Sequence, residues 1–435
     1  MYHDTCSSSS AVSLYTPTHT VVVTKESEET FLINAIDEPL VLGKPIEDTS
    51  PDKKTTDVQA RTMRTAFFTM FPMFMGYAAL VTLQSNIKDR LHIGDNGSSA
   101  SYQFSFAVSL LYLGNLVFRL MHNVLFCLLR PRHRVVIAYC CMMFSTALLP
   151  VAYYFAASQH VLWVYVAYLF GGVAIGTFES NLISVLTPLG HGTKVWAQLG
   201  IPIGFNGISV GAFALFAVFP SCIDLQAAVY CFISVSNLLG LLFFVLVIPD
   251  VHFESSHRTF KDFVSDMAHF REWVPLIGAH SFSLAVDMFA VSLGAAIQLY
   301  IYDMSHVPLW HGSSATVPVD VFRAIFNSCS LIGDATGRKL AYHTKRHVMP
   351  IWFLIFTCCG IGLILSKQGI MAPLGMLFVM FANGSIYAHT TKYVDDKVHH
   401  RFNLVALSIW LFVGDIGSFA GANLVNAVRV AVGCA

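Results

Sequence analysis

The stretch that organises this chain is FRAIFNSCSLIGDATGRKLAY, residues 322–342. It places Asp334 and Arg338 four residues apart in an otherwise apolar segment, so on a helix the two side chains share a face. Each charged side chain costs roughly 2.5–3.5 kcal/mol to hold in hydrocarbon on insertion scales. We therefore expect the two side chains to face each other and a polar path rather than lipid.

The composition is that of a polytopic membrane protein. Of 435 residues, 55% are hydrophobic and 12% are charged, and the mean hydropathy is +0.61. The 26 Lys and Arg residues balance the 26 Asp and Glu residues, which argues against a nucleic-acid partner or an acidic partner. The ten cysteines form no CxxC pair, and we interpret them as small core residues rather than as a metal site or a disulfide framework.

Apolar runs long enough to cross a bilayer as helices recur from Thr65 onward. The sequence thus predicts an all-α polytopic membrane protein with about eleven transmembrane helices. The predicted spans are 65–84, 103–129, 135–157, 161–187, 197–220, 226–248, 274–302, 319–340, 349–366, 370–390 and 403–432.

The predicted spans divide into six and five around one long connection. Residues 1–60 are polar and lack helical periodicity, so we expect a disordered cytosolic tail. A six-helix bundle follows over 61–248, then a cytosolic loop over 249–273 and a five-helix bundle over 274–435. Two bundles around a central path are the plan of many secondary transporters, and the arrangement is major-facilitator-like.

Basic residues predict the orientation of the chain. Fourteen lie in the connections on the side of the N-terminal tail, and three lie in the connections on the opposite side. The N-terminus is therefore predicted to be cytosolic and the C-terminus extracytosolic. Asn96-Gly97-Ser98 is a glycosylation acceptor pattern in the first outer loop and agrees with this assignment. We expect the protein to lie in the plasma membrane, although the sequence contains no decisive targeting signal.

Glu179 and Asp287 are carboxyl-bearing residues within predicted spans. Glu179 is in the middle of the fourth span and Asp287 is in the seventh. Either could be a neutral group hydrogen-bonded to a neighbouring helix. Alternatively, either could line a substrate path, since ionisable residues inside a membrane mark functional sites.

Other polar groups in the spans have both a structural and a functional interpretation. Arg119 lies halfway along the second span, where it could pair with a buried acid or extend toward the inner interface. Asp415 in the last span lies beside glycines and could bond to the backbone. His122, His280 and His389 could relay protons, but satisfied core histidines are the more common case.

The motifs of several enzyme and pump classes are absent from the sequence. It contains no Walker loop, no HExxH and no GxSxG. We therefore expect no enzyme activity, no cofactor and no bound metal. The remaining functional class is transport driven by the gradient of the solute itself or of a coupled ion.

Several motifs resemble those of the equilibrative nucleoside transporters. Phe326-Asn327 followed by DATGR at 334–338 resembles the FN…DxxGR signature, with a longer interval. FVMFANG at 378–384, followed by Lys397-Val398, is similar to the FxxFxNG…KV stretch. LGIPIGFNGISVG at 199–211 is similar to the GQGxAG region of the fifth span.

This resemblance implies a facilitator of nucleosides or nucleobases, with purines favoured, that works by alternating access. It implies that Asp334 and Arg338 bind the ribose hydroxyls. Glu179 stands where the family carries a purine-contacting glutamine, which suggests an altered base preference or coupling to protons. The first span lacks the PWN-type tract of the family. We expect Tyr77 to stack on the base in its place.

Other functional interpretations stay open. GTFESNLIS at 176–184 and HHRFNLVALSIW at 399–410 also resemble the battenin-like endolysosomal membrane proteins. Another solute transporter of the major facilitator type is a further alternative. A non-transporting scaffold or receptor is disfavoured, because it has no reason to bear the cost of buried Glu179, Asp334 and Arg338.

Overall fold

The computed structural model describes residues 53–93, 99–126, 129–219, 222–250, 260–301 and 306–431. The predicted glycosylation acceptor and nearly all of the predicted tail lie outside these residues. Among the described residues, the first helix is α2, which begins at Lys53 within the last eight residues of the predicted tail. The last proline before the helix is Pro51, and the eight residues from Lys53 to Ala60 contain neither proline nor glycine to prevent helix formation.

Long helices account for most of the described chain, and each of the predicted spans corresponds to one of them. The six that precede the long connection are α2 (Lys53–Thr82), α4 (Ser99–Leu125), α5 (Pro131–Pro150), α6 (Leu162–Leu186), α7 (Gly190–Val218) and α8 (Ile223–Val247). The five that follow it are α10 (Phe270–Ile301), α11 (Val319–His343), α12 (Leu354–Leu365), α13 (Met371–Lys397) and α14 (Asn403–Ala431). We call these two sets the N-terminal bundle and the C-terminal bundle.

Shorter elements connect the long helices. The connection predicted as a loop over 249–273 contains helix α9 (Phe260–Ala268), and α10 begins within it at Phe270, so the loop prediction is wrong for this part. A hairpin of β1 (His306–Pro308) and β2 (Thr316–Pro318) follows α10, with Val307 opposite Val317. The remaining elements are α3 (Gln84–Arg90), a π turn η1 (Val151–Phe155) and the 3-10 turns η2 (Thr187–Leu189), η4 (Pro350–Phe353) and η5 (His400–Phe402).

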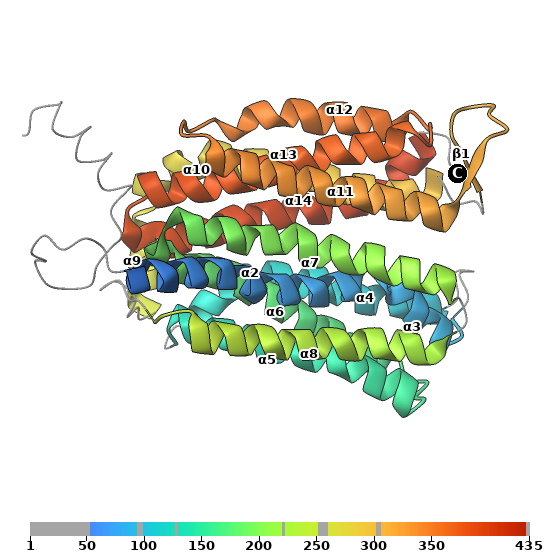
Figure 1. The fold of residues 1–435 in the computed structure, drawn as a ribbon, viewed down its shortest axis with the longest axis horizontal. Coiled ribbons are helices and arrows are strands. Elements are labelled where there is room, and N and C mark those ends of the chain that lie inside the picture. The colour runs from blue at the N-terminus through green and yellow to red at the C-terminus, as the bar shows by residue number, and fades with distance from the viewer. Residues whose placement is uncertain are drawn as a thin grey trace, which may run out of the picture. The chain divides into compact units, whose positions relative to one another are not determined.

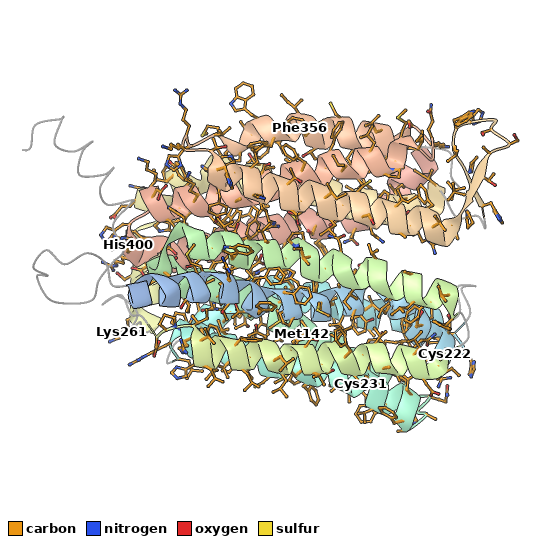
Figure 2. The ribbon with its side chains drawn as sticks, in the orientation of Figure 1. Met142, Cys222, Cys231, Lys261, Phe356 and His400 are labelled. Carbon is orange, nitrogen blue, oxygen red and sulfur yellow. The ribbon has the colours of Figure 1, made fainter. Side chains whose placement is uncertain are left out.

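Eight segments of the described chain are long and apolar enough to cross a membrane, and one of them, 162–216, spans both α6 and α7. Helix α11 is not among them, because its polar side chains lower its hydropathy. Large apolar side chains are exposed on the outer faces of both bundles. Phe356 of α12 is 40% exposed, whereas Met142 of α5 is fully buried inside its bundle (Figure 2). An apolar outer face of this kind suits a lipid environment.

The long helices run side by side, with α10–α14 on one side and α2–α8 on the other (Figure 1). Within the N-terminal bundle α2 packs against α7 and α4 packs against α6, and within the C-terminal bundle α11 packs against α13 and α10 against α14. The bundles meet where α7 contacts α11 and α14 contacts α4. We call the two ends of this assembly the α9 end and the hairpin end.

Glycines allow some of the closest helix approaches. A Cβ atom at Gly333 or Gly337 of α11 would collide with the α13 backbone carbonyls of Leu377 or Phe381, so this contact requires glycine. By contrast, a Cβ at Gly207 or Gly211 of α7 would have no neighbour within 4 Å. The small residues of α7 therefore do not all serve helix packing.

The described cysteines are free, but not all of them are core residues. Cys140, Cys358 and Cys359 are exposed on helix surfaces, so their interpretation as small core residues is wrong. A small apolar thiol is compatible with a lipid-facing position, which hydropathy cannot distinguish from a core position.

Candidate functional site

A group of buried charged side chains lies inside the helix assembly, with Arg119 of α4 at its centre. The Arg119 Nη2 atom lies 2.5 Å from Glu179 Oε2 on α6, and its Nε donates to Asp415 Oδ2 on α14 at 2.7 Å. Asn115 donates to the other oxygen of Asp415 at 3.0 Å. Arg119 thus pairs with two acids at once, and the partners of Asp415 are side chains rather than backbone.

Tyr387 of α13 links this arginine to a second one. Its hydroxyl donates to Glu179, and its ring lies 4.3 Å from the guanidinium carbon of Arg338. Arg338 in turn binds Asp334, with Nε 2.6 Å from Oδ1 and Nη2 3.3 Å from Oδ2. The ring of Trp410 of α14 packs against Tyr387 with 4.9 Å between centroids. We call Arg119, Glu179, Asp415, Tyr387, Arg338 and Asp334 the central group.

The local geometry of α11 explains how Arg338 reaches this position. Helical side chains tilt toward the N-terminus of their helix, so Arg338 extends away from the α9 end and back toward Asp334. Gly384 of α13 lies against the carbonyl and carboxylate of Asp334, where a Cβ atom would clash. The close packing of α11 on α13 therefore leaves the ion pair only 3% exposed.

The other two predicted site residues are Tyr77 and Asp287. Tyr77 of α2 packs on Phe205 with 5.7 Å between ring centroids, and it is close enough to Arg119 and Glu179 to interact with their charges. Asp287 of α10 is fully buried and is hydrogen-bonded to Thr357 and Asn383 rather than to the central group. Three predicted site residues therefore belong to the central group, Tyr77 lies beside it, and Asp287 is not hydrogen-bonded to it.

The central group has more carboxylates than cations. Three carboxyl groups and two guanidinium groups give a net charge of −1 when all are ionised. Burying charged groups is costly unless each is paired and hydrogen-bonded, and here each carboxylate has a guanidinium partner. The group is thus electrostatically compensated in the structure, but its charge balance is sensitive to any added ligand.

Two buried donors, one in the central group and one beside it, have no hydrogen-bond partner among the described residues. They are Arg338 Nη1 and Trp410 Nε1, and both side chains contact the ring of Tyr387. An unsatisfied buried donor costs about 1–3 kcal/mol. A polar ligand next to Tyr387 would therefore be favoured by two donors and an aromatic face.

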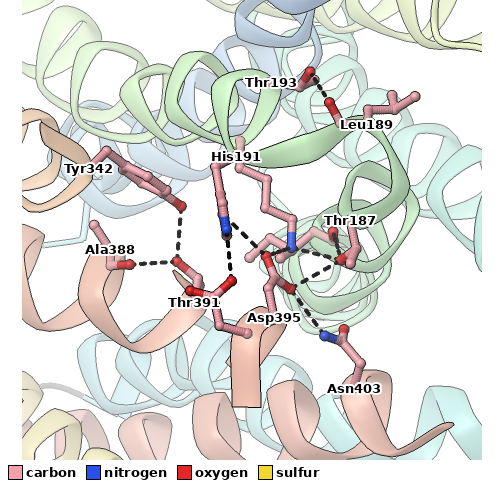
Figure 3. A network of polar contacts seen from close by, with 12 residues as sticks. Thr187, Leu189, His191, Thr193, Tyr342, Ala388, Thr391, Asp395 and Asn403 are labelled. Atoms are coloured by element: carbon pink, nitrogen blue, oxygen red, sulfur yellow. Dashed lines mark hydrogen bonds and ion pairs between the residues drawn. The ribbon is translucent and has the colours of Figure 1, made fainter. Parts of the chain in front are cut away.

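A second group of polar contacts joins the bundles at the α9 end (Figure 3). Lys194 of α7 is 1% exposed, and its Nζ lies 2.5 Å from Asp395 Oδ2 on α13 and 2.7 Å from the Thr187 hydroxyl. Asn403 donates to Asp395 at 3.1 Å. The pairing explains why a lysine can be buried here, because its charge is compensated across the bundle interface.

Two histidines complete this second group through Asp396. The Nε2 atom of His191 lies 2.9 Å from one carboxylate oxygen of Asp396, and that of His347 lies 3.3 Å from the other. Burial lowers the pKa of His347, although the charge of Asp396 raises it. We call Lys194, Asp395, His191, Asp396 and His347, with Thr187 and Asn403, the α9-end group.

The hydrogen bonds and ion pairs between the two bundles, as far as the described residues show them, extend from the central group to the α9 end. Between the two groups, Gln198 of α7 donates to Thr391 of α13 at 2.8 Å. Toward the hairpin end, Gly207 and Gly211 of α7 lack close neighbours. The structure therefore has its bundles joined at the α9 end.

Sequence reasoning missed Tyr387, Trp410 and the buried pair Lys194–Asp395. Lys194 counted only as a loop charge in the orientation argument. The available signal was the polar run AHTTKYVDD at 388–396, which continues an apolar helix without a turn residue. Polar side chains on every face of a helix indicate contacts on several sides, as α13 has here.

Comparisons with known proteins give a likeness of fold only. No protein-family model matches this chain, and no curated protein matches it in sequence. The E. coli fucose:proton symporter FucP aligns with a TM-score of 0.58 at 15% identity, covering 84% of this chain and 92% of that chain.

Two further solved structures align similarly. The major facilitator superfamily proton:xylose symporter XylE has a TM-score of 0.55 at 13% identity, with 86% and 90% coverage of this chain and that chain. The human organic anion transporter MFSD10 has a TM-score of 0.54 at 13% identity, with 86% and 95% coverage. The predicted all-α, major-facilitator-like fold is confirmed by these structures.

Proposed function

We propose that this chain is a membrane transporter that moves small polar solutes by alternating access. The observation that carries this proposal is the central group, which places buried charges and two unpartnered donors between the bundles. The structural neighbours support it, because they include proton symporters of fucose and xylose and a human organic anion transporter. A purely structural role would leave the cost of the buried charges unexplained.

We further propose nucleosides or nucleobases as the substrates. A ribose has vicinal hydroxyls, which suit one acceptor and one fork-shaped donor, and Asp334 with Arg338 supplies these. A base has a flat face and polar edges, which suit Tyr387 or Tyr77 together with Glu179. The motif resemblance of α11 and α13 to the equilibrative nucleoside transporters supports the same assignment.

The test is uptake of labelled adenosine, inosine and hypoxanthine into cells that lack purine transport and express the chain. We expect uptake of at least one, competed by unlabelled compound. Fucose and xylose serve as comparison substrates, because a sugar transporter of the same fold is the competing assignment. Uptake of a sugar and of no purine compound, with the protein at the surface, would reject the nucleoside proposal.

Substitutions in α11 test the proposed ribose contacts. Asp334→Asn and Arg338→Ala should each abolish uptake while the protein still assembles, as checked by a single peak in size-exclusion chromatography. Lys339→Ala is the matched control, because Lys339 is the exposed neighbour of Arg338 and should leave uptake unchanged. Near-normal transport in both site variants would remove these residues from the substrate site.

The proposed setting is the plasma membrane, with the α9 end on the cytosolic side. The excess of basic residues in the connections at the α9 end supports this orientation. Endolysosomal localisation of an untagged chain, together with the absence of purine uptake, would instead favour the battenin-like alternative.

A further inference from the structure

Asp287 is a buried carboxyl group that differs from those of the central group. It lies on α10 and is fully buried against α12 and α13. Thr357 of α12 donates to its Oδ1 at 2.7 Å, and Asn383 of α13 lies 2.7 Å from its Oδ2. Both neighbours are neutral, and no Lys or Arg among the described residues forms an ion pair with Asp287.

The two neighbours suit both protonation states of a carboxyl group. A threonine hydroxyl can donate or accept, and an asparagine side chain presents a donor or an acceptor after rotation of its amide. An arginine can only donate, so Glu179, Asp415 and Asp334 are each held against a permanent positive charge. Asp287 is thus the buried carboxyl group that can gain or lose a proton without losing its hydrogen-bond partners.

The charged groups around Asp287 support the same conclusion. Asp334 of α11 is the charged residue that interacts with Asp287. On α14, which packs along α10, Asp415 is directed at Arg119 instead. On α10 itself, His280 lies two turns away and bonds to Thr390 of α13.

The other elements packed against α10 carry their charged or titratable groups elsewhere. Cys358 and Cys359 of α12 are exposed. Asp266 of α9 binds Arg401, and the charged residues of α13, with His389, lie beyond Tyr387 toward the α9 end. A second negative charge at Asp287 is therefore opposed by Asp334 and has no compensating cation nearby.

We propose that Asp287 is a proton-binding site that takes up one proton from water and returns it in each transport cycle. The proposal rests on the proposed transport function. Protonation of Asp287 affects the central group through α13. Asn383 bonds to Asp287, and its neighbour in the chain, Gly384, packs on Asp334. A proton on Asp287 removes the repulsion between the two carboxylates. Glu179, which the sequence suggested for this role, is instead paired with Arg119.

Infrared difference spectroscopy of the purified protein tests the site without any substrate. A pH titration in H₂O and D₂O should show the C=O band of a protonated carboxylic acid that disappears as the pH rises. Asp287→Asn should abolish this band, whereas Glu179→Gln should retain it. The opposite result, loss of the band only in Glu179→Gln, would overturn the proposal, as would a band that persists in both variants. Thr357→Val, which keeps the carboxyl group, should retain the band at a shifted frequency.

Transport assays test the coupling separately. Uptake in the wild type should rise as the external pH falls, by up to about tenfold per pH unit where the site is mostly empty. Asp287→Asn should lose this dependence while keeping exchange of labelled for unlabelled substrate. A wild-type pH dependence that survives in Asp287→Asn would overturn the coupling role. If the wild type moves none of the tested solutes, the proposed function fails, and the infrared result still decides whether Asp287 binds a proton.

Discussion

The central group and the α9-end group both join the N-terminal bundle to the C-terminal bundle, but they differ in exposure and in chemistry. The side chains of Arg119 and Glu179 are 5% and 6% exposed, and guanidinium groups supply all of the positive charge in the central group. In the α9-end group, His191 and His347 are 33% exposed, and as histidines they carry a positive charge only when protonated.

This difference suits different roles for the two groups in the proposed transport cycle. Alternating access requires the bundles to separate at one end while they stay in contact near the middle. Permanently charged, deeply buried pairs favour a contact that persists, whereas half-exposed pairs with titratable partners favour a contact that breaks and re-forms. We therefore expect loss of the inter-helix pairs of Arg119 to affect assembly, and substitutions in the α9-end group to affect which end is open.

The largest effect is expected for Arg119→Met. This change leaves Glu179 and Asp415 buried without their cation, and removal of one partner of a buried ion pair costs about 3–5 kcal/mol. Thermal denaturation in detergent should show a strongly lowered melting temperature. A triple variant that adds Glu179→Gln and Asp415→Asn should recover most of the stability, because no unpaired charge remains. A single variant as stable as the wild type would contradict the persistent role of the central group.

A smaller effect is expected for Lys194→Met at the α9 end. Asp395 loses its cation but keeps the Asn403 and Thr187 contacts, and one carboxylate rather than two is left unpaired, so the cost should be about 3 kcal/mol, at the low end of the range for a broken buried ion pair. The expected readout is conformational. In a background without native cysteines, Gln198→Cys should react faster with a maleimide when Lys194→Met is present. Unchanged reactivity would mean that this pair does not hold the α9 end closed.

The lipid environment explains which parts of the fold could be predicted from the sequence. A helix must span the hydrocarbon core, which imposes run lengths that hydropathy detects. All of the predicted spans therefore correspond to helices, including α11, whose charged face weakens its signal. The start of α2 at Lys53 and helix α9 were missed, because both lie in polar segments where that requirement does not act.

The candidate site was predictable only where its contacts are local. Asp334 and Arg338 pair within one helix, and their spacing of four residues predicts this directly. Arg119 and Asp415 are 296 residues apart, and Glu179 and Tyr387 are 208 apart. Helix packing alone decides these pairs, so the sequence indicated buried charges without indicating their partners.

Tyr387→Phe sharpens the comparison within the central group. The change removes the hydrogen bond to Glu179 across the bundle interface, but it keeps the ring that packs on Arg338 and Trp410. The net loss should be about 0.5–1.5 kcal/mol, well below that of Arg119→Met. Thermal denaturation measures the loss, and uptake assays show whether substrate affinity falls as well. A loss as large as that of Arg119→Met would mean that the hydroxyl, rather than the ion pair, holds the bundles together.

The smallest effect is expected for His347→Gln and should depend on pH. Burial lowers the pKa of His347 below the ordinary value of about 6.5, with Asp396 opposing the shift. The folded state therefore binds this proton less readily than the unfolded state does. The stability of the closed α9 end should be intact above about pH 6.5 and should fall as His347 becomes protonated at lower pH. Glutamine removes this titration, so maleimide labelling of Gln198→Cys should accelerate less on acidification in His347→Gln than in its parent. Equal acceleration in both would assign the acid response to His191, or to groups of the central group, and would remove the proposed difference in titratability between the two groups.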